Sequence, residues 1–257
     1  VQSGAQVQQL ATGGSAVHVL AENPAGDLLA VGGEDGSVQL WQLAPAALQH
    51  TLSGHTDAIS GLSFAADGST LVSASQDGAL RIWNVAEGTA QQFLQGSEQG
   101  LWDLAVQPNG PWLVGAGSDG AVWVWNVDAL AFEPAQLRRH SNEVNAVNFS
   151  ADGSVMGSAG ADAAVYLWNV ANPAAEPDAL IGHSISVNGL AFAPGGDWVV
   201  TASSDGTLRR WSLSSDALVA KACRTAGRNL SLEEWTQYFP TDVSQYRKTC
   251  PELNGPE

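Results

Sequence analysis

A tryptophan that returns at an almost constant interval is the feature that most constrains this fold. Trp41, Trp83, Trp125, Trp168 and Trp211 are separated by 42, 42, 43 and 43 residues. Each interval holds short apolar segments separated by turns that contain glycine or proline. A fixed period of this length is typical of repeat architectures, and four strands per period indicate the blade of a β-propeller.

The second repeat shows the pattern most completely. It begins with Gly54-His55, carries Asp77-Gly78 in a turn and ends with Trp83-Asn84. These residues resemble those of WD40 repeats, and the resemblance covers about residues 5–213. It implies an all-β propeller in which each repeat contributes one four-stranded sheet. We therefore assign residues 1–215 to a WD40 β-propeller with five repeats, each ending at one of the periodic tryptophans.

The order of the predicted strands poses the question of ring closure. Residues 5–12 form a predicted outer strand before the first inner strands, whereas no outer strand is evident after Trp211. We expect the N-terminal strand to complete the last blade, because closure would leave no long strand edge exposed. The alternative is that two or more repeats lie upstream of Val1. An open arc would contradict closure.

The composition changes after residue 215, and residues 216–257 predict a short helical extension. Residues 217–226 have a helical pattern followed by Gly227, and Ser231-Leu232-Glu233-Glu234 has the form of a capping box. The tail resembles an extension found on WD40 arrays of large bacterial, notably cyanobacterial, multidomain proteins, on residues that include Ala222-Cys223-Arg224 and Glu234-Trp235. The resemblance implies the C-terminal sensor part of a STAND-like signalling or defence protein. A chain that starts at Val1 fits a piece of a longer protein.

The charge and the apolar pattern exclude two classes of partner. The formal net charge is −16, and residues 1–216 hold 21 acidic residues against five arginines. Nucleic acid is thus not expected as a partner, because phosphate binding needs clustered lysine and arginine. An acidic surface can simply favour solubility, or it can bind a protein with a basic surface. No apolar run approaches the ~20 residues of a membrane helix, so we expect a cytoplasmic protein.

Cys223 and Cys250 both lie in the tail, and their redox state stays open.

The resemblance also implies a chain of hydrogen bonds in three of the repeats. A buried indole N–H needs an acceptor, a hydroxyl can accept it while donating to imidazole, and imidazole can donate to a carboxylate. The matching residues are His55, Ser73, Asp77 and Trp83; His140, Ser158, Asp162 and Trp168; and His183, Thr201, Asp205 and Trp211. The first repeat has Val31 at the hydroxyl position and the third has Gly115, with Ser97 near the histidine position. We expect those two blades to be less rigid or to be held by packing.

These histidine, hydroxyl and aspartate sets do not predict catalysis. A catalytic triad needs an exposed nucleophile and an oxyanion site, whereas these sets recur in register beside a buried tryptophan. The Asp-Gly turns are isolated and lack the dense ligand spacing of a calcium loop. No Gly-Lys-Ser/Thr phosphate loop occurs, since the only lysines are Lys221 and Lys248. We therefore expect neither an enzyme nor a bound metal or cofactor.

What remains is a surface around the central channel, on the side of the histidine loops. The second residue of four inner strands should approach this rim, and acidic residues precede three of these strands. We predict a partner-binding rim of Asp57, Ser60, Glu98, Trp102, Glu143, Asn145 and Asn188. Trp102 is a plausible interface anchor, although it could instead pack against a neighbouring loop.

The sequence thus favours a non-enzymatic protein–protein interaction module. It would act as a sensor or scaffold at the C-terminal end of a larger bacterial signalling or defence protein. Two alternatives stay open: a structural subunit of a protein assembly, and, more remotely, a propeller enzyme.

Overall fold

The computed structural model describes residues 9–128 and 134–213, and these residues form strands and no helices. The inner strands of the five repeats are β1 (Val17–Glu22), β5 (Ile59–Phe64), β9 (Leu101–Val106), β13 (Val144–Phe149) and β17 (Val187–Phe192). The second strands are β2 (Leu28–Gly33), β6 (Thr70–Ser75), β10 (Trp112–Gly117), β14 (Val155–Gly160) and β18 (Trp198–Ser203). The third strands are β3 (Val38–Leu43), β7 (Ala79–Asn84), β11 (Ala121–Asn126), β15 (Ala164–Asn169) and β19 (Leu208–Ser212). The outer strands are β4 (Ala46–Leu52), β8 (Thr89–Gln95), β12 (Ala135–Arg138) and β16 (Asp178–Ile181).

Strands that follow one another in the sequence pair antiparallel, so each repeat is a separate sheet. Four sheets have four strands, and the last, β17–β18–β19, has three within the described residues. The same register recurs in every sheet: Val17, Ile59, Leu101, Val144 and Val187 all pair with the last residue of their second strand. This register allows residues of different blades to be compared position by position.

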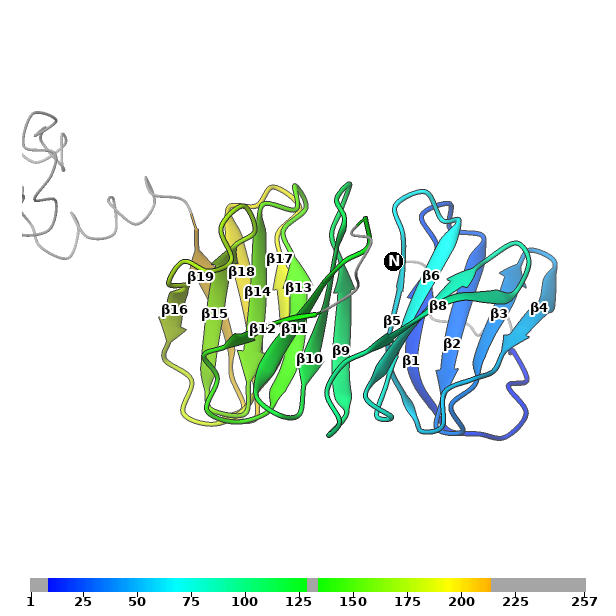
Figure 1. The fold of residues 1–257 in the computed structure, drawn as a ribbon, viewed down its shortest axis with the longest axis horizontal. Helices are drawn as coiled ribbons and strands as arrows, with labels where there is room; N and C mark the ends of the chain where they lie inside the picture. The colour runs from blue at the N-terminus through cyan, green and yellow to red at the C-terminus, as the bar shows by residue number, and fades with distance from the viewer. Residues whose placement is uncertain (1–8, 129–133, 214–257) are drawn as a thin grey trace, which may run out of the picture.

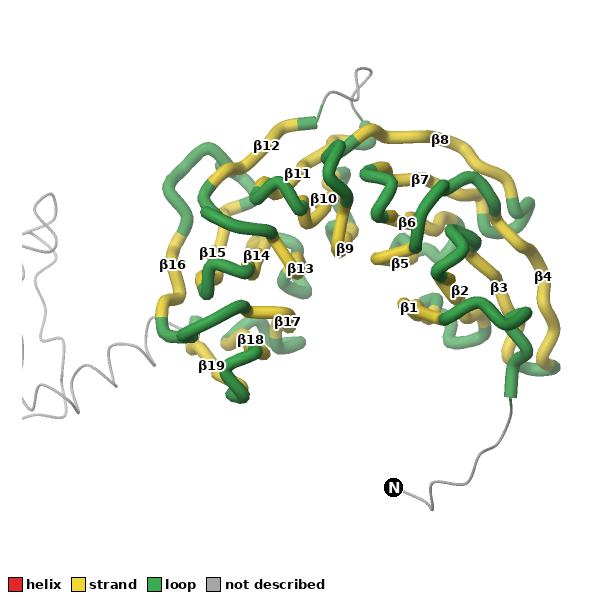
Figure 2. Tube along the Cα trace, turned by 90° about the horizontal axis from the view of Figure 1, so that it is seen from below, coloured by secondary structure: helices red, strands yellow, loops and turns green. Residues whose placement is uncertain are grey.

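The five sheets stand side by side like blades around a common axis (Figure 1). Figure 2 shows the inner strands along the concave side of an arc and the outer strands β4, β8, β12 and β16 along its periphery. Each inner strand contacts the inner strand of the next blade. Because a neighbouring blade covers each face of an internal sheet, its middle strands need no alternation of apolar and polar residues.

One apolar contact repeats at every junction between blades. A residue near the start of each third strand lies in the same buried cluster as the first residue of the next inner strand. These pairs are Val38 with Ile59, Leu80 with Leu101, Val122 with Val144, and Val165 with Val187. All eight side chains are at most 1% exposed. Burial of such side chains is the main source of stability for a stack of blades.

The expected closure of the ring by residues 5–12 is not found. The described blades form an open arc, with β1 at one end and β17 at the other (Figure 2). Residues 9–12 form no strand, and Thr12 O accepts a hydrogen bond from Gln39 Nε2 of the first blade. Ser15 Oγ accepts another from Asp35 N. The part of this segment that is described therefore lies against the first blade and not the last, while residues 5–8 fall outside the described residues.

The open ends leave apolar residues exposed that are buried inside the arc. Leu208, at the position of Val38, Leu80, Val122 and Val165, is 74% exposed, and Val17, at the position of Ile59, is 44% exposed. The predicted helical extension, residues 216–257, lies outside the described residues. Within the described part of the chain, no helix has the length and apolar character needed to cross a membrane.

Candidate partner-binding rim

The second blade contains a continuous chain of side-chain hydrogen bonds. Trp83 Nε1 donates to Ser73 Oγ at 2.8 Å, and His55 Nε2 lies 2.8 Å from the same oxygen. His55 Nδ1 lies 2.9 Å from Asp77 Oδ2. Since a carboxylate can only accept, His55 Nδ1 carries a proton, and in the tautomer protonated at Nδ1 the Nε2 atom accepts from the serine hydroxyl. This chain links the second strand, the third strand and the loop before the inner strand.

The aspartate at the end of this chain also fixes the backbone of two loops. Asp77 Oδ2 accepts from Thr56 N, and Oδ1 accepts from Ala79 N. Burial raises the pKa of this carboxyl, but the hydrogen bonds from His55 and from these amides outweigh it and lower the pKa to about 2. The carboxylate is therefore ionised at neutral pH and holds the histidine loop in place.

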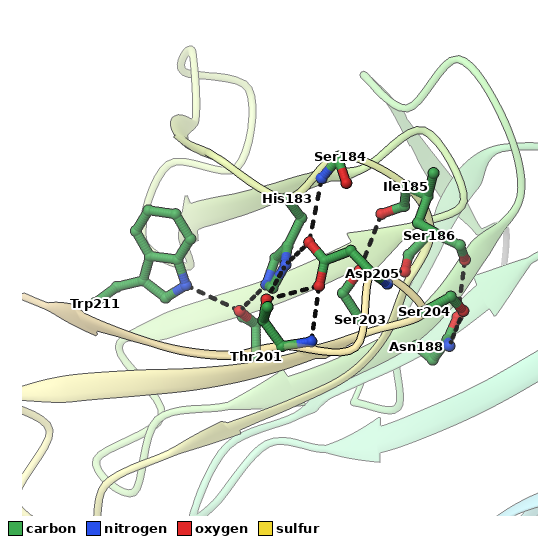
Figure 3. A network of polar contacts seen from close by, with 11 residues as sticks. His183, Ser184, Ile185, Ser186, Asn188, Thr201, Ser203, Ser204, Asp205 and Trp211 are labelled. Atoms are coloured by element: carbon green, nitrogen blue, oxygen red, sulfur yellow. Dashed lines mark hydrogen bonds and ion pairs between the residues drawn. The ribbon is translucent and has the colours of Figure 1, made fainter.

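The fourth and fifth blades repeat the arrangement. His140 lies 2.9 Å from both Ser158 Oγ and Asp162 Oδ1, and Trp168 Nε1 donates to Ser158 at 3.0 Å. In the fifth blade Thr201 takes the place of the serine, between Trp211 Nε1 at 2.9 Å and His183 Nε2 at 2.7 Å (Figure 3). Burial lowers the pKa of His140, so its ring stays neutral at neutral pH.

The same geometry argues against a nucleophilic role. The hydroxyl groups belong to Ser73, Ser158 and Thr201, and these side chains are 0% exposed. Each hydroxyl is also already bonded to an indole and an imidazole. A serine nucleophile must reach its substrate, so these sets serve the blade and not a reaction. Among the described residues, no group of three or more histidine, cysteine, aspartate or glutamate side chains could hold a metal.

The third blade is held by packing where the chain of hydrogen bonds is missing. The Trp125 ring occupies the space beside Gly115, where an added Cβ would come within 3.2 Å of it. Trp125 is fully buried, stacks on Trp123 and donates its indole N–H to Gln95 O at 3.3 Å. Asp119 accepts from Trp123 Nε1 and from Arg138 instead of from a histidine. A larger aromatic contact therefore replaces the polar one.

The first blade uses a glutamine where the other blades use a hydroxyl. Trp41 Nε1 donates to Gln39 Oε1 at 3.0 Å, and Gln39 Nε2 donates to Thr12 O at 3.1 Å. Sequence reasoning missed Gln39, because it sits two residues before the tryptophan and not at the hydroxyl position, which Val31 fills. Val31 is buried in the same sheet.

Five of the seven predicted rim residues are exposed around the concave side of the arc. Asp57, Glu98, Trp102, Glu143 and Asn188 are accessible, and Trp102 is 38% exposed. Its indole N–H donates to no described residue, unlike the buried indoles above. The other two predicted residues connect blades: Ser60 Oγ donates to Leu101 O at 2.6 Å, and Asn145 Nδ2 donates to Val187 O at 2.9 Å. These bonds tie adjacent blades together and leave Ser60 and Asn145 half-buried.

The structure adds two residues to this region that sequence reasoning missed. His18 occupies the position of Ser60, Trp102, Asn145 and Asn188 in the first blade and is exposed. The register of the inner strand could have found it, but the first repeat lacks the Gly-His start that marks this register. Asp103 follows Trp102, at a position where other blades have Gly61, Ala146 and Gly189. An acidic residue at a position where three other blades have glycine or alanine was the signal in the sequence that could have identified Asp103.

Asp103 reaches across the junction between the third and fourth blades. Its Oδ2 accepts from Val147 N at 3.0 Å, and Oδ1 accepts from Leu104 N at 2.8 Å. Burial raises the pKa of the Asp103 carboxyl to about 6, although both amide hydrogen bonds oppose the shift. No described arginine or histidine forms an ion pair with it.

Comparison with known families identifies the fold class. The sequence model of the family described as "WD domain, G-beta repeat" matches residues 4–42, 46–84, 88–126, 133–169 and 177–212. These matches cover well over half of the chain, which therefore belongs to the WD40 repeat family. Repeats of this family typically mediate protein–protein interaction, and their propellers are generally non-catalytic. No curated protein matches the chain in sequence.

Proposed function

We propose that this chain is a protein-recognition module whose rim binds a partner protein with a basic surface. The observation that carries the proposal is the combination of an exposed aromatic, Trp102, with three exposed carboxylates, Asp57, Glu98 and Glu143, around one edge of the arc. Exposed tryptophans are enriched among the anchors of interfaces, and a surface of one charge steers an oppositely charged partner. The rigid blades hold these side chains in place.

The wider context forms part of the same proposal. The resemblance of residues 216–257 to extensions of bacterial WD40 arrays supports a sensor or scaffold at the C-terminal end of a larger STAND-like signalling or defence protein. Partner binding would then shift an attached effector between two states, by the difference in affinity for those states. The gene sequence upstream of the Val1 codon tests this context, because it should encode an effector domain; an unrelated or absent upstream region would contradict it.

The test of the rim is capture of a partner by the whole chain and by two matched variants. Trp102→Ala removes the exposed aromatic of the rim, and we expect it to weaken capture of a partner by about tenfold or more. Phe93→Ala removes an aromatic of 52% exposure on the outer strand β8, at the opposite edge of the blade, and should leave capture unchanged. Equal capture by wild type and Trp102→Ala would refute the rim as the binding surface.

A structural subunit of an assembly is the second candidate, favoured by the exposed apolar ends of the arc. Leu208 and Val17 are exposed where their counterparts in other blades are buried. Sedimentation of the purified chain separates the two functions. A monomer that captures a foreign protein supports recognition, whereas concentration-dependent association that Leu208→Asp abolishes supports assembly.

A further inference from the structure

The concave wall of the second to fifth blades contains a cavity of about 530 Å³. It is lined by parts of β5, β9, β13 and β17, and its polar lining includes Ser63, Trp102, Asp103, Asn145, Asn148 and Asn188. Among the described residues, its lining includes one carboxylate and no lysine, arginine or histidine. The cavity thus offers hydrogen-bond acceptors and a negative charge without a positive counterpart.

Two consecutive departures from the repeat place these groups in the cavity. At the position of Trp102, the second, fourth and fifth blades have serine or asparagine, and at the position of Asp103 they have glycine or alanine. The junctions of those blades form without a carboxylate, so packing does not require one here. An acid with a raised pKa weakens the folded state near neutral pH, as expected for a group kept for binding rather than for stability.

Both oxygens of Asp103 keep acceptor capacity. Each accepts one backbone N–H, from Leu104 and Val147, whereas a carboxylate oxygen can accept two hydrogen bonds. The Asn145 amide nitrogen is directed at Val187 O, which fixes the orientation of the amide, and its Oδ1 accepts from no described residue. Trp102 also belongs to the lining of this cavity.

We propose that this cavity binds a positively charged side chain of a protein partner, with arginine as the best match. A planar guanidinium can donate to a carboxylate and a carbonyl while it stacks on an indole, and an ammonium group cannot do all three equally well. This inference rests on the proposed rim function, because it names the group of the partner that the rim admits. The guanidinium would pair with the Asp103 carboxylate inside the cavity, whose lining also includes Trp102 and Asn188.

The test uses the whole chain and the peptide acetyl-Gly-Arg-Gly-amide, with the citrulline peptide as its uncharged control. Binding is followed by NMR from the indole N–H signal of Trp102, which the Trp102→Leu variant assigns. We expect saturable binding of the arginine peptide and at least about tenfold weaker binding of the citrulline peptide. Equal binding of the two peptides, or no saturable shift, would overturn the inference.

Variants locate the contact within the protein. Asp103→Asn preserves shape and should weaken arginine binding by about tenfold or more, whereas Asp178→Asn removes an equal charge from the outer strand β16, away from the rim and the cavity, and should change it by less than about threefold. Asp103→Ala, the residue at the equivalent position in the fourth blade, replaces Asp103→Asn if the latter does not fold. Unchanged binding by the folded Asp103 variant sinks the inference. If a partner captured through Trp102 binds the Asp103 variant as tightly as wild type, the rim function stands and the arginine site alone fails.

Discussion

At the scale of single residues, the buried serine and threonine hydroxyls are the polar groups whose removal should destabilise the fold most. Ser73 Oγ is the shared partner of Trp83 Nε1 and His55 Nε2. Ser73→Ala leaves two buried polar groups without a partner, and we expect a loss of about 2–4 kcal/mol in the free energy of unfolding. Urea denaturation of the variant measures this loss. Ser53→Ala, at an exposed position, should change stability by less than about 0.5 kcal/mol; similar losses in both variants would show that the hydroxyl is not special.

The contribution of Asp103 to the free energy of unfolding should depend on pH with the opposite sign to that of Asp77. Its pKa is raised to about 6 in the folded state, so between about pH 4 and pH 6 the folded chain keeps a proton that the unfolded chain releases. Stability contributed by this group therefore falls as pH rises through that window, by at most about 3 kcal/mol. Asp77, with a pKa of about 2, instead loses its contribution as pH falls below about 4.

Unfolding curves of wild type and Asp103→Asn from pH 4 to pH 8 measure this effect. The variant also loses one of the two acceptor oxygens that bind Leu104 N–H and Val147 N–H, which shifts stability by a constant amount at all pH values. We expect the difference between variant and wild type to move in favour of the variant as pH rises from 4 to 6, and to level off above pH 6. A difference that does not vary with pH would contradict a raised pKa at Asp103.

At the scale of elements, the turn between the second and third strands has one strained member. Gly36, Gly78, Gly120 and Gly206 all have positive φ after the turn aspartate, and the fourth blade has Ala163 there with a φ of 67°. A left-handed conformation costs a residue with a side chain about 1–2 kcal/mol. Glycine relieves this strain but makes the unfolded chain more flexible, so we expect Ala163→Gly to raise the free energy of unfolding by a net amount of about 0.5–1 kcal/mol. The thermal midpoint should rise accordingly. A lower midpoint would show that the turn is not strained.

The junction contact predicts unequal costs for the same substitution in different blades. Leu80→Ala removes a side chain that is 0% exposed and packs at the next junction, and should cost about 2–5 kcal/mol. Leu208→Ala changes a side chain that is 74% exposed and should cost less than about 1 kcal/mol in the isolated chain. Chemical denaturation of both variants makes the comparison. Equal losses would mean that Leu208 is covered in solution.

The elements were largely predictable from sequence because the tryptophan period and the glycine turns are local signals. The WD40 class follows from them, and the positions of strands within a repeat follow from the register. The contacts that replace the hydrogen-bond chain in the first and third blades were not predictable from the sequence. The Gln39–Trp41 hydrogen bond and the Trp123–Trp125 stack involve residues outside the repeat positions of that chain. The roles of Ser60 and Asn145 as ties between blades were missed because a strand residue near a channel can face either the channel or the next blade. Closure failed as a prediction because pairing across the ring is a long-range contact.

At the scale of the whole molecule, the main contacts of each blade within the described residues are with its neighbours, so stability is distributed along the arc. The internal blades have two covered faces and the end blades have one. We expect amide hydrogen exchange to be fastest in β1 and β17–β19 and slowest in β6, β7, β10 and β14. Exchange measured by mass spectrometry after proteolysis tests this gradient. Uniform protection across all five blades would contradict it.

The junctions also give the arc a direction. At each junction a residue of the third strand, such as Leu80, packs against a residue of the next inner strand, such as Leu101. Two equivalent residues do not face each other at these junctions of the described arc. The two ends of the arc are consequently different surfaces, one bearing Leu208 and the other Val17. A two-fold symmetric pairing would bring identical ends together and could not reproduce the junction. Anything that extends the arc must therefore be added head to tail, in a single orientation at each end.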